Sequence, residues 1–500
     1  MSVIKKFLGQ TAVYGLTTVF SRLFNFILTP IYTSVYATAT YGVFTTLYSY
    51  AAMVNALLAF GMESTFFRYL NKHEDKKQEV YNNCFLCVAF IATLFLVTGF
   101  VFTDPIARYI YTGVDNKILD YQHYVRIFVA MLAVDALCVI PFAKLRADGK
   151  PLRYSVIKFV NIGTFVGLNL FFIFVVPFMI KNHWPLGDWF ASWYRFQWIG
   201  YVFIANLVAS VVTMLMLLPQ FLELQLRFDK ALFRKMFSYS WPIVIANLSF
   251  IVNENLDKLA LGKLLPAEIS DAQVGIYGAV AKIAVFMSIF ITAFRLGAEP
   301  FIFGYAKNLN AKKAYAVILH YFVIALTLLF VFLVANIELL KYFITRKEYW
   351  VGLPAVPFLL AGYMCLGIYM NLSIWYRLSD QTRFGLYISV IGAVITILFN
   401  LLLIPKFSYM GSAWVSMLTY FVMMVISYVL GQKYYPIPYN LKRLVLYLVL
   451  SSVLVGLSFW VFDRNIYIGN ALLLAFLAFI VFVEKDDVRM LLRKDLKNNN

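Results

Sequence analysis

Four cationic side chains interrupt or border long apolar blocks, where an ionised group is costly unless it meets a partner or water. Arg22, Lys282 and Arg295 lie inside such blocks, and Lys258 lies at the edge of another. Helix rise places Arg22, Lys258 and Lys282 in the same half of a membrane, with Arg295 near the other end of the Lys282 helix. Arginine binds phosphate oxygens with a bidentate fork and lysine binds them as a point charge. The pattern therefore predicts a cationic substrate-binding cavity.

Structural pairing is the alternative for two of these cations. Asp257 precedes Lys258, and Glu299 follows Arg295 by one helical turn. Lys258 is also close enough to the end of its block to extend its ammonium group to the membrane interface. On that alternative, Asp257 and Glu299 hold the fold or a gate rather than contact substrate. Glu63, at the inner end of its block, is assigned the same gate or structural role.

Two further carboxylates are candidates for binding a proton or a sodium ion inside the membrane. Asp135 is the one carboxylate well inside an apolar block, where it is either a proton or sodium site or the partner of another cation. Glu254, between Asn253 and Asn255, makes its block unusually polar and is the second candidate. Apart from such a coupling proton or sodium ion, we expect no cofactor. The four histidines are scattered, so the sequence predicts no metal site.

The elements that must position these residues are membrane-spanning helices. Of the 500 residues, 62% are hydrophobic and 14% are charged, against about a quarter charged in soluble domains. The apolar residues form blocks long enough to cross a bilayer. We expect an all-α polytopic membrane protein with about fourteen spans, near 9–35, 41–62, 80–104, 121–141, 152–180, 194–219, 237–262, 274–298, 314–337, 352–372, 384–404, 410–431, 441–462 and 466–483.

Charge placement predicts the orientation. With the N-terminus inside, 28 of the 43 Lys and Arg residues fall in inner segments, 12 in outer loops and three within spans. Both termini are therefore expected in the cytoplasm. Because the net charge of +18 is spread over short clusters between apolar blocks, we expect membrane lipids rather than nucleic acid as partners.

An internal repeat divides the chain. Shifted by 236 residues, Tyr41-Gly42 falls on Tyr277-Gly278 and Gly61-x-Glu63 falls on Gly297-x-Glu299, within 12 identities in 57 positions. An even number of spans separates the copies, which predicts a parallel repeat about an axis along the membrane normal. The expected units are two six-helix lobes, 1–220 and 221–432, then two additional helices in 433–484 and a cytoplasmic tail, 485–500.

The sequence resembles a known transporter family in these same spans. Gly9-Gln10-Thr11-Ala12-Val13-Tyr14-Gly15, Ser21-Arg22-Leu23 and Gly61-Met62-Glu63 look like the start of a polysaccharide transporter. Leu256-Asp257-Lys258, Gly275-Ile276-Tyr277-Gly278 and Phe294-Arg295-x-x-x-Glu299-Pro300-Phe301 carry the resemblance in the second half. The family is the polysaccharide-transporter branch, which includes O-antigen flippases, of the superfamily of MATE drug exporters and lipid II flippases.

This resemblance implies a MATE-like fold and alternating access of a central cavity. It also implies that the protein flips an undecaprenyl-pyrophosphate-linked oligosaccharide from the cytoplasmic to the periplasmic leaflet, in contact with polysaccharide biosynthesis machinery. Cationic residues line the cavity in relatives of this kind, where several carry more arginines; here two of the four cations are lysines. The pyrophosphate is then the expected ligand of Arg22, Lys258, Lys282 and Arg295.

Two other functions make different demands on the sequence. A MATE-type ion-coupled drug exporter is expected to carry more acidic than basic residues in its cavity, whereas the intramembrane bias here is basic. A membrane enzyme is expected to carry a sizeable catalytic loop or a carboxylate cluster at one interface, and the sequence predicts neither. We therefore favour a flippase that is not an enzyme, with the drug exporter as the alternative.

Overall fold

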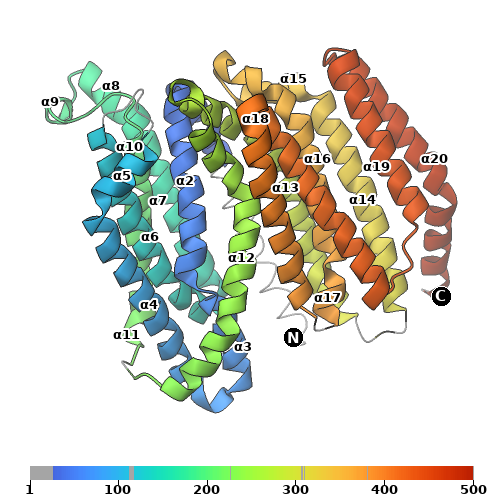
Figure 1. Cartoon of the computed structure of the whole chain (residues 1–500), viewed down its shortest axis with the longest axis horizontal. Helices are drawn as coiled ribbons and strands as arrows, with labels where there is room; N and C mark the ends of the chain where they lie inside the picture. Colours follow the sequence, from blue (N-terminus) through green and yellow to red (C-terminus); the bar gives the residue numbers. More distant parts are fainter. Residues whose placement is uncertain are drawn as a thin grey trace.

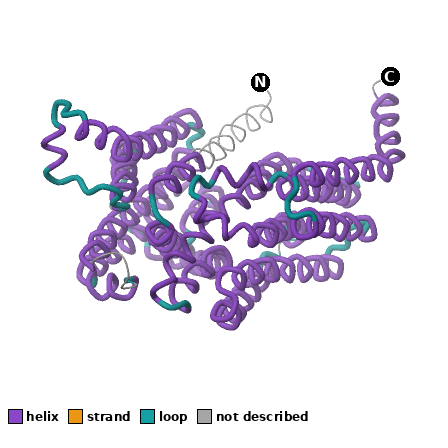
Figure 2. The backbone as a smooth tube through the Cα atoms, turned by 90° about the horizontal axis from the view of Figure 1, so that it is seen from above, coloured by secondary structure: helices purple, strands orange, loops and turns teal. Residues whose placement is uncertain are grey.

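The structure is a computed structural model, and the part of it that can be described consists of helices joined by short connections (Figure 2). It describes residues 26–498 except 112–117, 226, 306–307, 309 and 380, and no side chain at 74, 299–301, 303–304 or 486–498. No strand occurs among the described residues, which agrees with the expected all-α class.

The helix bounds follow the predicted spans closely. The first half contains the helix Phe26–Val35, α2 (Thr38–Ala59), α3 (Met62–Lys72), η1 (Glu74–Lys76), α4 (Lys77–Val101), α5 (Thr103–Ile110), α6 (Ile118–Ala147), α7 (Pro151–Leu170), η2 (Phe171–Val175), α8 (Val176–Lys181), α9 (Gly187–Ala191), α10 (Gly200–Met216) and α11 (Leu218–Leu222). The second half contains α12 (Lys230–Leu264), α13 (Ala267–Gly304), α14 (Ala311–Ala335), α15 (Ile337–Leu340), η3 (Lys341–Phe343), η4 (Lys347–Ala355), α16 (Val356–Leu372), α17 (Ile374–Leu378), α18 (Arg383–Tyr434), α19 (Leu441–Gly456), η5 (Leu457–Val461) and α20 (Ile466–Asn498).

The described helices account for the expected number of spans. Eleven helical segments are long and apolar enough to cross a membrane, and Phe26–Val35 and Gly200–Met216 are shorter apolar helices. The α18 segment contains two expected spans, 384–404 and 410–431, joined across a kink at Ser408. Thirteen of the predicted spans therefore coincide with described helices, and the described part of the first predicted span, Phe26–Val35, is also helical. The helix α20 runs on to Asn498, past the predicted end of its span.

Local sequence signals explain where several helices begin. Pro151 occupies the first turn of α7, where its missing N–H is not needed. Asp229 caps α12 by accepting a 2.9 Å hydrogen bond from the Leu232 N–H. That N–H and the ammonium group of Lys76 hold the pKa of Asp229 below its usual value. Between α2 and α3, Gly61 adopts φ +62°, a left-handed conformation that glycine reaches without strain.

The helices form two groups with one long helix between them. In Figure 1, α4, α6, α7 and α10 lie on one side and α14, α16 and α18 on the other. The helix α12 contacts α2, α13 and α18, so it links the groups. We name the ends of the bundle by the sides that the charge distribution predicts. The outer end carries the turn between α12 and α13, and the inner end carries the connection between α2 and α3.

The two additional helices, α19 and α20, lie at the edge of the molecule against α14 (Figure 1). A charged cluster joins the three helices near the inner end. The carboxylate of Glu484, only 4% exposed, lies 3.0 Å from His320 of α14 and 3.4 Å from Arg443 of α19. It also accepts a hydrogen bond from the Tyr447 hydroxyl. Sequence analysis missed this cluster, because Glu484 directly follows the last predicted span.

Candidate functional site

A cavity of about 200 Å³ lies between the two groups of helices, and we call it the interlobe cavity. It is bordered by α2, α12, α13 and Tyr363 of α16. Lys258 and Lys282 both line it, so two of the four predicted cations come together here. Two positive charges therefore face the same cavity. Among the described residues, Lys282 has neither a hydrogen bond nor an ion pair. No described side chain therefore neutralises its positive charge by direct contact.

Lys258 differs from Lys282 because its charge is shared with a neighbouring carboxylate. Its Nζ lies 2.9 Å from Asp257 Oδ1 and donates a 2.7 Å hydrogen bond to the Glu254 carbonyl oxygen. The other oxygen of Asp257 accepts a 2.7 Å hydrogen bond from the buried Tyr277 hydroxyl. The Asp257–Lys258 pairing expected as the structural alternative is thus present, yet the lysine still borders the cavity. Asp257 orients Lys258 and ties α12 to α13.

The three consecutive polar residues centred on Glu254 lie in two different environments. Glu254 and Asn255 line the interlobe cavity, whereas Asn253 is buried against α18. The amide of Asn253 donates to the Ser389 carbonyl at 3.4 Å, and its Oδ1 accepts from the Thr396 hydroxyl at 3.2 Å. Two of these polar residues of α12 therefore line the cavity, and the third forms hydrogen bonds that hold α12 against α18.

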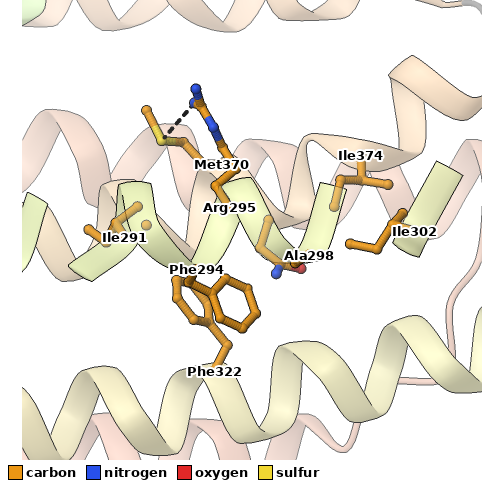
Figure 3. Close-up of a pocket in the computed structure, with 10 residues that line it drawn as sticks. Ile291, Phe294, Arg295, Ala298, Ile302, Phe322, Met370 and Ile374 are labelled. Atoms are coloured by element: carbon orange, nitrogen blue, oxygen red, sulfur yellow. Dashed lines mark hydrogen bonds between the residues drawn. The ribbon is translucent and has the colours of Figure 1, made fainter. Parts of the chain in front are cut away.

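Arg295 lies away from the lysines, thirteen residues further along α13, or about 20 Å by helix rise. Figure 3 shows its guanidinium group above Met370, with Nη1 3.7 Å from the sulfur. The pocket beside it, about 20 Å³, is large enough only for a water molecule and is lined mostly by apolar side chains such as Phe294 and Phe322. Arg22 lies outside the described residues, as does the side chain of Glu299.

A second cavity, of about 330 Å³, lies inside the first lobe, and we call it the N-lobe cavity. It is lined by α6, α7 and α10 together with Glu63 at the start of α3. Asp135, Lys158 and Ser210 all border it, so a carboxylate, an ammonium group and a hydroxyl group face the same space. Glu63 forms an ion pair with Arg146 at the inner end of this cavity.

Lys158 is a candidate site residue that the sequence analysis missed. It lines the same cavity as Asp135, for which the sequence left open either an ion site or pairing with another cation. The charge count placed it in an inner segment, because it lies only seven residues after the start of α7. Its ammonium group also lies 4.4 Å from the centre of the Phe142 ring. One feature of the sequence could have indicated this position: Asn161 follows Lys158 by three residues, which places both polar side chains on the same face of the helix.

The outer end of the interlobe cavity is closed by contact between α2 and α13. A Cβ atom at Gly42 would lie 1.8 Å from the Asp271 carbonyl oxygen, and one at Gly275 would lie 1.9 Å from the Thr38 carbonyl oxygen. Glycine at both positions is what allows the two backbones to meet. Beyond them, the Tyr349 hydroxyl donates a 2.9 Å hydrogen bond to the Tyr36 carbonyl. The connection before α16 thus covers the same end.

A comparison with protein families matches residues 7–305, more than half of the chain, to the family described as polysaccharide biosynthesis protein. The chain belongs to this family. The matched region includes α2, α12 and α13, which supply the interlobe cavity, and the whole N-lobe cavity. A search of curated proteins gives no significant match.

Solved structures with a similar fold include a lipid II flippase and MATE multidrug transporters. An inward closed conformation of the lipid II flippase MurJ aligns with a TM-score of 0.69 and 14% identity, covering 95% of this chain and all of that one. An inward-facing MATE multidrug transporter of the MOP superfamily aligns with a TM-score of 0.64 and 14% identity, covering 85% and 95%. The MATE multidrug transporter DinF-BH, solved as a complex, aligns with a TM-score of 0.63 and 16% identity, covering 86% and 96%. At these identities the likeness establishes the fold of this family member.

Proposed function

We propose that this protein is a flippase that moves an undecaprenyl-pyrophosphate-linked oligosaccharide from the cytoplasmic to the periplasmic leaflet. The proposal places it in the inner membrane of a bacterium with both termini in the cytoplasm. Family membership supports a role in polysaccharide biosynthesis. The fold, shared with a lipid II flippase and with drug exporters, supports translocation rather than catalysis.

The observation that carries the proposal is the pair of lysines in the interlobe cavity. A cation inside the membrane is stable only if water or an opposite charge compensates it. Asp257 compensates Lys258, whereas Lys282 has no such partner among the described residues. A pyrophosphate supplies the missing negative charge and accepts charge-assisted hydrogen bonds from both ammonium groups. Binding is therefore favoured for a polyanionic headgroup.

Transport follows from the way the cavity is closed. In this conformation, the contacts of Gly42 and Gly275 hold α2 against α13 at the outer end. Separation of these helices, with approach of the lobes at the inner end, would expose the same lysines to the opposite side. The substrate would then be released when water hydrates the pyrophosphate. Tyr41-Gly42 and Tyr277-Gly278, equivalent under the repeat, lie on the two helices that must separate.

A MATE-type exporter of small cationic molecules is the alternative, because MATE transporters share the fold. Lys258 and Lys282 make that function less favourable, since a cationic drug would meet two like charges. Glu254 is the one carboxylate bordering the same cavity among the described residues. The charge of the lining therefore favours an anionic substrate.

The test is transport of a fluorescent lipid-linked oligosaccharide in proteoliposomes. Lys282→Ala removes a charged hydrogen-bond donor worth about 1.5–3 kcal/mol, and we expect transport at low substrate concentration to fall about 10- to 100-fold. Lys282→Arg keeps the charge and should retain most of the activity. Export of a cationic dye by the wild-type protein, with no movement of the lipid-linked oligosaccharide, would replace the flippase by the exporter.

A further inference from the structure

The N-lobe cavity is larger than the interlobe cavity and has a different charge balance. Glu63, Asp135, Arg146 and Lys158 contribute two negative and two positive formal charges, so their net charge is zero. Glu63 and Arg146 form an ion pair, and Asp135 and Lys158 border the same cavity with opposite charges. A pyrophosphate placed here would approach two carboxylates. The cavity therefore suits an uncharged polar ligand.

The remaining lining residues form hydrogen bonds in both directions. Asn161 and Asn206 each carry amide donors and a carbonyl acceptor, and Ser210 and Thr213 carry hydroxyl groups. A ligand with many hydroxyl groups needs such mixed partners, because each hydroxyl both donates and accepts. A site with only donors or only acceptors would leave about half of the ligand's hydrogen bonds unmade, and each unmade bond would cost binding free energy.

Aromatic rings supply an apolar surface beside these polar groups. Phe142 and Tyr154 pack edge to face, with ring centres 5.4 Å apart, and both border the cavity. The C–H face of a sugar ring is apolar while its rim of hydroxyl groups is polar. An aromatic wall next to amides and carboxylates matches both features. The volume of about 330 Å³ is at the lower end of the range for small-molecule sites.

A hydrogen bond links the wall of the N-lobe cavity to the wall of the interlobe cavity. Asn206 of α10 lines the former, and its Nδ2 donates a 2.8 Å hydrogen bond to the hydroxyl of Tyr48, which lines the latter. The two cavities are thus neighbours across α2. Lys282 lines the same cavity as Tyr48, so a ligand whose phosphates bind Lys282 can extend its sugar toward this contact.

We infer that the N-lobe cavity is a saccharide subsite that binds the neutral sugar portion of the substrate while the interlobe lysines bind its pyrophosphate. This inference rests on the proposed function. On this inference, the first lobe distinguishes between substrates by their sugars, and the interlobe cavity binds the phosphates. The Tyr48–Asn206 hydrogen bond marks the place where the lining residues of the two cavities meet.

The experiment compares two ligands on the purified full-length protein: undecaprenyl pyrophosphate without sugar, and the sugar-bearing lipid extracted from cells that lack the protein. Val139→Phe fills the N-lobe cavity without removing a hydrogen-bonding side chain, and Val139→Ala is its matched control. We expect Val139→Phe to weaken binding of the sugar-bearing lipid about tenfold and to leave the sugar-free lipid unchanged. Asn161→Ala should act in the same direction, with thermal unfolding as its check because it bonds Thr213 at 2.9 Å.

The outcomes separate this inference from the proposed function. Equal binding of the sugar-bearing lipid by wild type and Val139→Phe would overturn the saccharide subsite. So would an equal loss for both ligands, which would mean that the filled cavity distorts the lysine site. Unchanged binding of both ligands by Lys282→Ala would refute the phosphate site instead. A tenfold loss confined to the sugar-bearing lipid in the Val139→Phe protein would support the subsite.

Discussion

Replacement of Gly275 by alanine should open the protein toward the outer side. The new Cβ would lie 1.9 Å from the Thr38 carbonyl oxygen, whereas a C···O contact requires about 3.3 Å. Because the obstacle is a backbone atom, no rotamer change relieves it, and α2 and α13 must move apart by about 1.4 Å. Overpacking of this kind costs about 1–3 kcal/mol, which shifts the conformational equilibrium about 5- to 150-fold away from the outer-closed state.

Thiol labelling measures this shift. In a variant without the four native cysteines, Ser49→Cys places a thiol on the wall of the interlobe cavity. An impermeant reagent added from the outer side should label it slowly with Gly275 present and at least several-fold faster in Gly275→Ala. Gly297→Ala, on the same helix, is the control, because a Cβ there meets nothing within 4 Å. Equal labelling of the two alanine variants, both folded, would refute the idea that Gly275 closes the outer end.

Two further predictions concern the charged clusters. Glu484→Ala should lower stability by about 2 kcal/mol, less than the 3–5 kcal/mol for breaking a fully buried pair because Arg443 is one-third exposed. A reduced apparent Tm in detergent would show this, whereas an unchanged Tm would mean that α19 and α20 are held by apolar packing alone. Asp257→Asn removes the carboxylate that compensates Lys258, so the affinity for inorganic pyrophosphate should rise about tenfold in calorimetric titration. A lower affinity would show that Asp257 acts mainly by orienting the lysine.

The sequence was sufficient for the fold because the bilayer imposes one strong requirement. A helix must stay apolar for about twenty residues to cross it, and that pattern is visible without any tertiary information. The helix lengths followed from it, as did the separation of Lys282 and Arg295 along the shared helix α13. Family motifs in the same spans pointed to the polysaccharide biosynthesis family, which the family comparison confirmed.

Which side chains meet was decided by tertiary structure. Helix rise gives the depth of a residue, but its neighbours depend on how each helix is rotated about its own axis and on which helix packs beside it. Lys158 and Asp135 are on different helices, and only the packing of α6 against α7 and α10 places both on one cavity. The ion pairs of Glu484 could not be predicted for the same reason, because its partners come from α14 and α19. The membrane requires each spanning helix to be apolar, so the sequence of a single segment is enough to predict that helix. A polar site is formed by side chains from several helices, so it exists only after those helices have packed.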